Sequence, residues 1–252
     1  WDNPYLTMQF DSEATIVAEL MKFAEAGNLY RGSKPVMWSP VEETALAEAE
    51  VEYEDITSTQ IDVAFEITES PIKELVGAHA VIWTTTPWTI PVNQALAYGP
   101  DIEYALISWP NAKYLVAREL ATEFITRITT VPSGQPSEPW PDADKWDENL
   151  QIFKGSDLAG TVARHPMHHL GGFYAKPRPF LPGDFVTTDS GTGLVHMSPD
   201  HGEDDFLLCR KNGIEPVFAV MADGRYRDDW EWLGAGDVDV DGKERRRSVI
   251  NK

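Results

Sequence analysis

The chain has almost no cysteine, little positive charge and no long apolar run. Cys209 is the single cysteine among 252 residues, so no internal disulfide can form and a reducing, cytoplasmic compartment is expected. The longest purely apolar run, residues 217–222, is far too short to span a bilayer, so no membrane partner is expected. The first residue is Trp1 and no signal sequence follows, so we expect a fragment of a longer protein.

Positive charge is scarce, because 21 Lys and Arg residues stand against 41 Asp and Glu, a formal net charge of -20. Phosphate contacts supply most of the affinity of a nucleic-acid binder, so this balance argues against a self-sufficient one. A nucleic acid held mainly by other parts of a larger protein remains possible. The basic cluster at residues 243–247 is interpreted as a solvated loop. With 42% hydrophobic residues, the chain can form one large domain with appendages.

Hydrophobic periodicity predicts many short strands and few helices. Helices are expected at residues 13–26, 118–128 and 203–212, and a further helix start at Ser39–Pro40. Strands are expected at residues 34–38, 47–54, 61–67, 78–86, 104–108, 113–117, 151–158, 185–188, 194–197 and 217–220, with a surface loop at 131–148. This pattern favours an α+β, β-rich fold, with a small closed or nearly closed β-barrel and helices packed outside it.

Polar side chains gather where the predicted strand 78–86 ends. The stretch Trp83–Asn93 reads Trp-Thr-Thr-Thr-Pro-Trp-Thr-Ile-Pro-Val-Asn, with two prolines within five residues. Because proline ends regular elements, three hydroxyl groups should lie where the strand opens into a loop. Such a place suits a small polar ligand. The alternative is that threonine is simply a good strand residue.

A second stretch, residues 191–206, has the same design. The predicted strand carrying His196 runs into a turn that contains Pro199, and a helix with acids in its first turn follows. The helix dipole and free backbone N–H groups favour a carboxylate there, so Asp205 should be ionised near neutral pH. An ionised carboxylate at a pocket wall is a natural partner for an ammonium group.

Three interpretations of this second stretch compete. A metal site could use His196, His201 and Asp205, but the two histidines straddle Pro199 and no cysteine pair supports zinc. A Ser/His/Asp triad could use Ser198, but no nucleophile-elbow glycine pattern surrounds it. The third is a hydrolytic pocket that recognises an ammonium group and is built jointly with the threonine stretch.

Together the two stretches resemble the editing (CP1) domain of class I aminoacyl-tRNA synthetases of the isoleucyl, valyl and leucyl group. Thr86 and Trp88 resemble the isoleucyl member, since the other two typically have an arginine and an acid there, and His196 favours the same member. The segments 3–8 and 44–53 resemble its flanking regions, and the match covers most of residues 1–227. The ATP-binding signatures HIGH and KMSKS are absent, so the fragment itself should not activate amino acids.

The resemblance implies hydrolysis of valine attached to the isoleucine tRNA. One methylene is worth only about 1–3 kcal/mol in a hydrophobic pocket, isoleucine against valine being the standard worked example. A second site must then remove the error. By resemblance, Asp205 binds the α-amino group and His196 limits the side-chain space. The remaining site residues are the water-positioning pair Thr86 and Asn93, and the contacts to the terminal adenosine and amino acid, Trp83, Thr84 and Thr85.

The resemblance also implies partners and domains. The expected partners are the 3′ end of isoleucine tRNA carrying valine and the rest of the parent synthetase in cis, the whole being a monomer. Editing should need no metal or cofactor, whereas the parent would use ATP and Mg for synthesis. The expected domains are a connecting arm at 1–54, the editing domain at 55–227 and a return arm at 228–252. Alternatives are a non-catalytic module that positions the tRNA acceptor end, an editing domain of the valyl or leucyl type, and a metal hydrolase.

Overall fold

The computed structural model describes residues 4–109, 112–129, 150–227 and 229–230. The chain divides into two compact units, Trp1–Lys34 and Pro35–Lys252. The loop expected at 131–148, the basic cluster at 243–247 and nearly all of the expected return arm lie outside the described residues. The division into arms at 1–54 and 228–252 therefore stays a prediction. Within the described ranges, no helix is long and apolar enough to cross a membrane.

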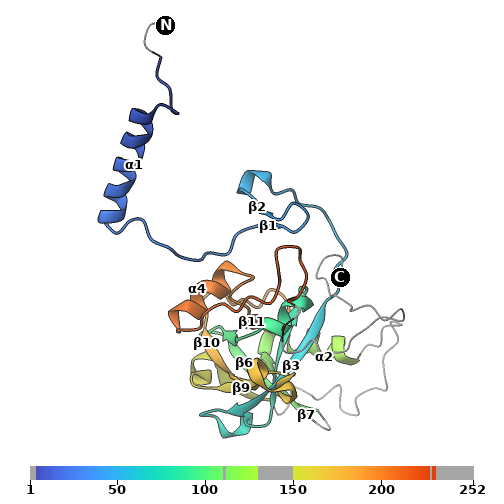
Figure 1. Ribbon diagram of the computed structural model, residues 1–252. Helices are drawn as coiled ribbons and strands as arrows, with labels where there is room; N and C mark the ends of the chain where they lie inside the picture. Colours follow the sequence, from blue (N-terminus) through green and yellow to red (C-terminus); the bar gives the residue numbers. More distant parts are fainter. Residues whose placement is uncertain (1–3, 110–111, 130–149, 228, 231–252) are drawn as a thin grey trace. The chain divides into compact units, whose positions relative to one another are not determined.

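The first unit consists of one helix and short flanking segments (Figure 1). Helix α1 (Phe10–Glu25) confirms the helix expected at 13–26, although it starts three residues earlier than expected. It ends before Gly27, whose φ of 76° places it in the left-handed region that glycine adopts most readily. No side chain of α1 is buried, so its apolar residues are exposed within this unit.

The second unit opens with a small hairpin of β1 (Trp38–Ser39) and β2 (Thr44–Ala45). The helix start expected at Ser39–Pro40 is therefore wrong, because Ser39 ends a strand and residues 40–43 form the turn. The strand expected at 34–38 is reduced to its last residue. The indole N–H of Trp38 donates to the Ala222 carbonyl at 2.8 Å, which ties the hairpin to a distant part of the chain.

The half-exposed strand expected at 47–54 is also wrong. Residues Glu48–Glu50 form a single 3-10 turn, η1, and residues 51–60 have no regular structure. The carboxylate of Glu50 accepts the backbone N–H of Ala47 at 2.8 Å, so a local bond competes with strand pairing. No neighbouring strand among the described residues offers this segment a partner, and alternation alone cannot form a strand.

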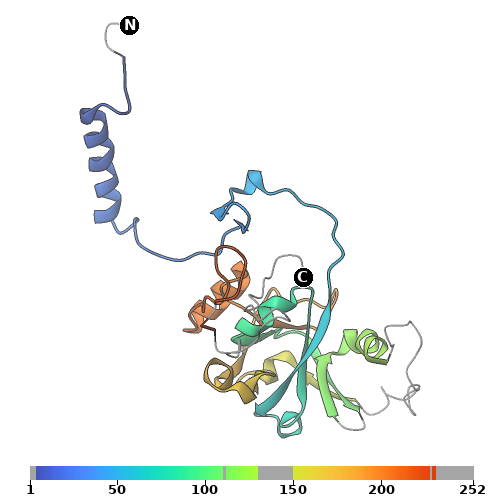
Figure 2. The ribbon, with the colours of Figure 1, turned by 45° about the vertical axis from the view of Figure 1, so that its right-hand side comes forward.

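Among the described residues, nine strands form the main sheet of the second unit, in the order β11-β5-β10-β9-β3-β4-β7-β6-β8. Figures 1 and 2 show this sheet from two directions. Their bounds are β3 (Ile61–Glu69), β4 (His79–Thr84), β5 (Ala95–Tyr98), β6 (Glu103–Trp109), β7 (Ala112–Ala117), β8 (Gln151–Lys154), β9 (Val162–Arg164), β10 (Pro177–Pro182) and β11 (Leu194–Met197). The expected closed barrel is not found, because within the described residues β11 and β8 each pair on one side only.

The hairpin expected around residue 110 is confirmed. Strands β6 and β7 pair antiparallel with Tyr104 opposite Ala117. Strands β3 and β4 also pair antiparallel, whereas β4 and β7 are parallel neighbours. The strand expected at 151–158 is confirmed only in its first half, since β8 gives way to the 3-10 turn η5 (Gly155–Leu158).

Strand β10 was not predicted from the sequence, because prolines occupy three of its six positions. Its first half, Pro177–Pro179, pairs with β9, and its second half, Phe180–Pro182, pairs with β5. Each half of β10 therefore pairs with a neighbouring strand on one side only. Proline, which has no N–H group, is tolerated on the unpaired side. The strands expected at 185–188 and 217–220 are wrong, apart from a single bridge between Val220 and Tyr226.

One hydrophobic core draws on nearly every strand of the sheet. Its buried members include Phe65, Ile82, Leu96, Leu106, Leu115, Ala163, Phe180 and Leu194. Residues from both ends of the strand order therefore share one core, so the sheet wraps around it while remaining open. Burial of this apolar surface is the main force that holds the second unit together.

Helices cover the remaining faces of the sheet. The helix expected at 118–128 appears as a 3-10 turn, η4 (Arg118–Leu120), followed by α2 (Ala121–Thr129). Phe124 of α2 packs against Val81, Ile107 and Val116 of the sheet. Helix α4 (Glu203–Lys211) confirms the helix expected at 203–212. The shorter elements are η2 (Lys73–Leu75), η3 (Pro87–Val92), η6 (His168–Leu170) and α3 (Gly172–Ala175).

Candidate functional site

The threonine stretch lies where β4 opens into η3, as the two prolines indicated. Thr84 is the last residue of β4, and its hydroxyl accepts the backbone N–H of Thr86 at 2.9 Å. Thr85 is exposed, and its carbonyl accepts the hydroxyl of Ser58 at 2.8 Å. Thr86 is half-buried and precedes Pro87, the first residue of η3. The hydroxyl of Thr84 therefore stabilises the strand end and keeps its own proton free for donation.

Thr89 connects the first stretch to the second. Its hydroxyl donates to the carbonyl of Thr86 at 2.8 Å and lies 3.1 Å from Nε2 of His196. Because the single hydroxyl proton goes to Thr86, Nε2 of His196 must carry a proton and donate it to Thr89. Nδ1 of His196 is then an acceptor, buried and without a partner among the described residues. This contact unites two segments that lie 107 residues apart.

His196 is a neutral imidazole over the physiological range. It lies on β11, opposite Leu96 of β5, and is 9% exposed. Burial, with a smaller contribution from the nearby His201, lowers its pKa from 6.5 to about 4. A buried, uncharged ring of fixed orientation is suited to limiting the volume of an apolar side chain.

Two glycines before β11 allow the turn at this point to pack closely against the neighbouring strands. Gly191 has a φ of 83°, and a Cβ there would lie 3.2 Å from the Trp83 ring. Gly193 has a φ of 71°, and a Cβ there would lie 2.3 Å from the Cβ of Ala117. The hydroxyl of Tyr104 donates to the Gly193 carbonyl at 2.7 Å and accepts the Gly99 N–H at 2.9 Å. The turn is therefore pressed against the ends of β4 and β7.

Asp205 lies in the first turn of α4, and its Oδ2 accepts the backbone N–H of Ser198 at 2.8 Å. Burial raises its pKa from 3.8 to about 6, and the Ser198 N–H only partly opposes this shift. Burial thus outweighs the helix-terminus effect that the sequence suggested. The carboxylate is still mainly ionised at pH 7, as predicted, and is a suitable partner for an ammonium group.

Asn93 has a structural contact that its sequence position did not reveal. Its side chain is 0% exposed, and Nδ2 donates to the carbonyl of Ala95 at 2.8 Å, which fixes the junction of η3 and β5. Its Oδ1 has no partner among the described residues. Trp83, the remaining residue of the predicted set, is half-buried beside Gly191.

Two further histidines, His201 and His165, have contacts of their own. His201 lies in the turn before α4, with its ring edge-on to Trp88 at 4.8 Å and Nε2 at 3.0 Å from the Asp200 carboxylate. His165, expected to be an ordinary loop residue, is instead 0% exposed. Cys209 is buried, as expected for a residue in the middle of a helix. In the described part of the chain, no three His, Cys, Asp or Glu side chains gather into a metal-ligand set.

The contacts of Thr89 and His165 were not predicted from the sequence. Thr89 lies three residues after Thr86, one turn of a 3-10 helix, so its spacing offered a signal. His165 had no such signal, because its partner is a backbone carbonyl 75 residues away.

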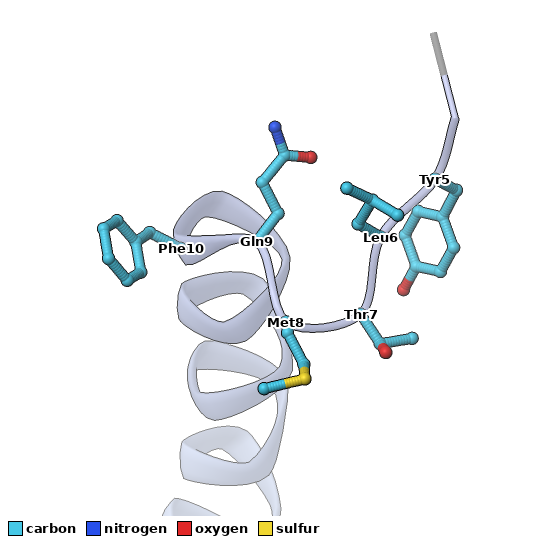
Figure 3. Close-up of a pocket in the computed structure, with 6 residues that line it drawn as sticks. All are labelled: Tyr5, Leu6, Thr7, Met8, Gln9 and Phe10. Atoms are coloured by element: carbon cyan, nitrogen blue, oxygen red, sulfur yellow. The ribbon is translucent and has the colours of Figure 1, made fainter. Parts of the chain in front are cut away.

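Two hollows lie away from this constellation. One, of about 550 Å³, is lined by the consecutive residues Tyr5–Phe10 of the first unit (Figure 3). Among the described residues, this one segment supplies the whole lining. The other, of about 260 Å³, is lined by residues of the sheet and α2, among them Asp62, Trp109 and Phe124. Neither hollow contains a residue of the predicted site.

Residues 1–225 match the family tRNA synthetases class I (I, L, M and V), and the chain belongs to this family. The isoleucine–tRNA ligase of Zymomonas mobilis is 58% identical over 93% of this chain and 24% of its own length. That of Gluconobacter oxydans is 50% identical over 90% of this chain and 23% of its own length. The chain thus spans about a quarter of the length of these curated relatives.

Similar solved structures include leucyl-tRNA synthetase domains. The crystal structure of GlLeuRS-CP1 gives a TM-score of 0.39 at 19% identity, covering 54% of this chain and 47% of that one. The P. falciparum cytosolic leucyl-tRNA synthetase editing domain gives 0.40 at 15% identity with the same coverage.

Proposed function

We propose that this chain is the hydrolytic editing domain of an isoleucine–tRNA ligase and that it deacylates valine misattached to isoleucine tRNA. The observation that carries the proposal is the junction of the two predicted stretches, where Thr89 bonds to His196 and Asp205 lies in the adjoining helix turn. The relatives named isoleucine–tRNA ligase support the choice of tRNA. Thr86 and Trp88 stand where the valyl and leucyl types would carry an arginine and an acid.

The proposed substrate is an ester between the carboxyl group of valine and a ribose hydroxyl of the terminal adenosine. Asp205 holds the α-ammonium group, and the buried ring of His196 borders the side chain and leaves no room for isoleucine. Trp83, Thr84 and Thr85 contact the adenosine and the amino acid. Because the substrate amine is charged and Asp205 is ionised at pH 7, this contact is a charge-assisted hydrogen bond.

In the proposed reaction, one water molecule attacks the ester carbonyl and the bond from that carbon to the ribose oxygen breaks. The ribose oxygen takes a proton, and valine leaves as the free acid. Thr86 and the buried Oδ1 of Asn93, which has no partner among the described residues, position the water. An aminoacyl ester is already activated, so positioning and stabilisation of the developing oxyanion are sufficient without a strong base. Editing by these residues uses no metal or cofactor, and ATP and Mg belong to synthesis by the parent enzyme.

The experiment is deacylation of valyl-tRNA by the full-length parent enzyme carrying Asp205→Asn. Asparagine keeps an oxygen for the Ser198 N–H but removes the charge that binds the ammonium group. Loss of a hydrogen bond to a charged group predicts a fall in kcat/KM of about 10- to 100-fold. Asp204→Asn is the matched control, since Asp204 is the exposed neighbour in the same helix turn, and it should change the rate less than about twofold.

Charging of the tRNA with isoleucine serves as the check that the variant enzyme is folded. Full deacylation by the Asp205→Asn enzyme would exclude Asp205 as the ammonium partner. A non-hydrolysable valyl-adenosine analogue tests the rival non-catalytic role. Only the editing proposal predicts that the analogue binds between Thr84 and Asp205.

A further inference from the structure

The 3-10 turn η3 is held from behind by two side chains that lie far away in the sequence. The carbonyl of Trp88 would normally accept the N–H of the residue three positions later, but that residue is Pro91, which has none. The hydroxyl of Tyr226 supplies the missing donor, at 2.5 Å from the Trp88 carbonyl. The carbonyl of Ile90 accepts the backbone N–H of Asn93 at 3.0 Å, and the imidazole of His165 adds a second contact to it, with Nε2 at 2.9 Å. These two carbonyls belong to the residues immediately before and after Thr89.

The hydrogen bonds of His165 fix its tautomer. Its Nδ1 accepts the backbone N–H of Met167 at 3.0 Å and therefore carries no proton. The proton must then lie on Nε2, which donates it to Ile90. The ring is 0% exposed and is flanked by Phe65 and Tyr174, with centroids at 5.7 and 4.8 Å. Each ring nitrogen has one fixed hydrogen-bond partner, so the ring has one orientation.

The electrostatic surroundings keep this ring neutral. Burial lowers the pKa of His165 to about 4, and the nearby positive charge of Arg178 acts in the same direction. The imidazole therefore keeps one donor and one acceptor throughout the physiological range. The contact with Ile90 is consequently a permanent feature of the fold at neutral pH.

We infer that His165 is a positioning residue for the editing site, with Tyr226 supporting it from the other side of Thr89. By fixing the carbonyls on either side, the two residues set the place of the Thr89 hydroxyl. That hydroxyl accepts the Nε2 proton of His196 and so fixes the ring that borders the amino-acid side chain. His165 touches neither substrate nor water, and it acts on the discrimination between valine and isoleucine. This inference rests on the proposed function.

The test compares His165→Gln with His165→Asn in the full-length parent enzyme. The glutamine amide nitrogen reaches approximately the place of Nε2 and can donate to Ile90, whereas the asparagine side chain reaches only the place of Nδ1. The measured quantity is the ratio of kcat/KM for valyl-tRNA to that for isoleucyl-tRNA. We expect the asparagine variant to lose about tenfold in this ratio, the effect of one buried hydrogen bond. The glutamine variant should stay within about threefold of wild type.

Charging with isoleucine and the thermal unfolding midpoint report whether each variant is folded. Equal ratios in folded wild type, His165→Asn and His165→Gln overturn the inference. A folded His165→Gln enzyme that loses as much discrimination as His165→Asn also overturns it, because the Ile90 contact would then be irrelevant.

Tyr226→Phe keeps the test decisive if both His165 variants unfold. It removes only the hydroxyl on the Trp88 carbonyl and should shift the same ratio in the same direction. An unchanged ratio in folded Tyr226→Phe then overturns the inference. If the wild-type parent does not hydrolyse valyl-tRNA at all, the proposed function fails. If it does hydrolyse valyl-tRNA and no variant shifts the ratio, only the positioning role fails.

Discussion

Tertiary contacts hold the side chain of His196 neutral and in one orientation. A solvent-exposed imidazole titrates near pH 6.5 and rotates freely. In this protein, burial lowers its pKa to about 4, and the Thr89 hydroxyl fixes the proton on Nε2. The residue therefore acts through its shape and not through its charge.

His196→Ala in the full-length parent enzyme should remove the protection of isoleucyl-tRNA. Removing the ring opens space for the extra methylene of isoleucine, so correctly charged isoleucyl-tRNA should be hydrolysed about tenfold faster or more. The measurement is the rate of deacylation of isoleucyl-tRNA. His169→Ala, a change at an exposed histidine outside the site, should leave this rate at the wild-type level. Continued protection of isoleucyl-tRNA in His196→Ala would mean that another residue sets the size limit.

Asp205 shows two effects in competition at one residue. Its place in the first turn of α4 and the Ser198 N–H both favour the ionised form, yet burial raises the pKa to about 6. The position of Asp205 on the helix could be predicted from the sequence, whereas its degree of burial could not. Its carboxylate is available for an ammonium group at pH 7 because the pKa, though raised, remains below 7.

At the scale of elements, the turn before β11 depends on backbone freedom. Gly193 combines a left-handed φ with close contact to Ala117. Gly213, at the end of α4, has nearly the same φ, 72° against 71°, but an added Cβ there would meet nothing within 4 Å. The two glycines form a matched pair that separates backbone strain from steric overlap.

We predict that Gly193→Ala destabilises the second unit more than Gly213→Ala does. Each substitution forces alanine into the left-handed region, at a cost of about 1–2 kcal/mol. Gly193→Ala adds overlap with Ala117, which costs about 1–3 kcal/mol more and displaces the strand that carries His196. Chemical denaturation of this chain measures the difference in the free energy of unfolding. Equal losses for the two variants would show that the approach to Ala117 is easily relieved.

Element η3 also shows why a short proline-rich turn can be ordered. Pro91 removes one internal hydrogen bond, and the Tyr226 hydroxyl replaces it at the Trp88 carbonyl. His165 adds a second contact to the Ile90 carbonyl, which also accepts the Asn93 N–H. Local and tertiary hydrogen bonds together therefore hold the turn.

At the scale of the whole molecule, buried titratable groups govern the response to acid. The pKa values of His165 and His196 are both lowered to about 4. Each histidine contributes stability that is fully present above pH 6.5, the unfolded value, and is lost as the pH falls toward 4. Asp205 acts in the opposite sense, since its raised pKa makes the folded state bind a proton first between about pH 6 and 4.

The two histidines outweigh the single aspartate, so stability should fall on acidification. We predict that the free energy of unfolding decreases by about 2–3 kcal/mol between pH 7 and pH 5. Urea denaturation of the chain at the two pH values measures this change. His165→Gln should reduce the decrease, because it removes one of the two titrating rings. A stability that is constant or rises toward pH 5 would contradict the assignment of two neutral, buried histidines.

The sequence by itself determined several local elements and the residue types available at the candidate site. Periodicity identified α4, β11 and the β6–β7 hairpin, because the spacing of their apolar residues matches the faces that they bury. It also identified α1, whose apolar residues have helical spacing but are exposed within their own unit. Prolines and threonines indicated where β4 ends, since both act through the nearest few residues. The types of His196 and Asp205 beside the threonine stretch predicted a hydrolytic pocket for an ammonium group, and the resemblance to editing domains implied an aminoacyl ester.

Tertiary structure alone decided which of these groups meet and in what state. The open order of the sheet, the two-sided pairing of β10 and the failure of strand 47–54 all depend on neighbours remote in the chain. The contact of Thr89 with His196 and that of His165 with Ile90 span 107 and 75 residues. Burial, which sets the pKa values of His196 and Asp205, is a property of everything packed around a residue, so no local pattern encodes it.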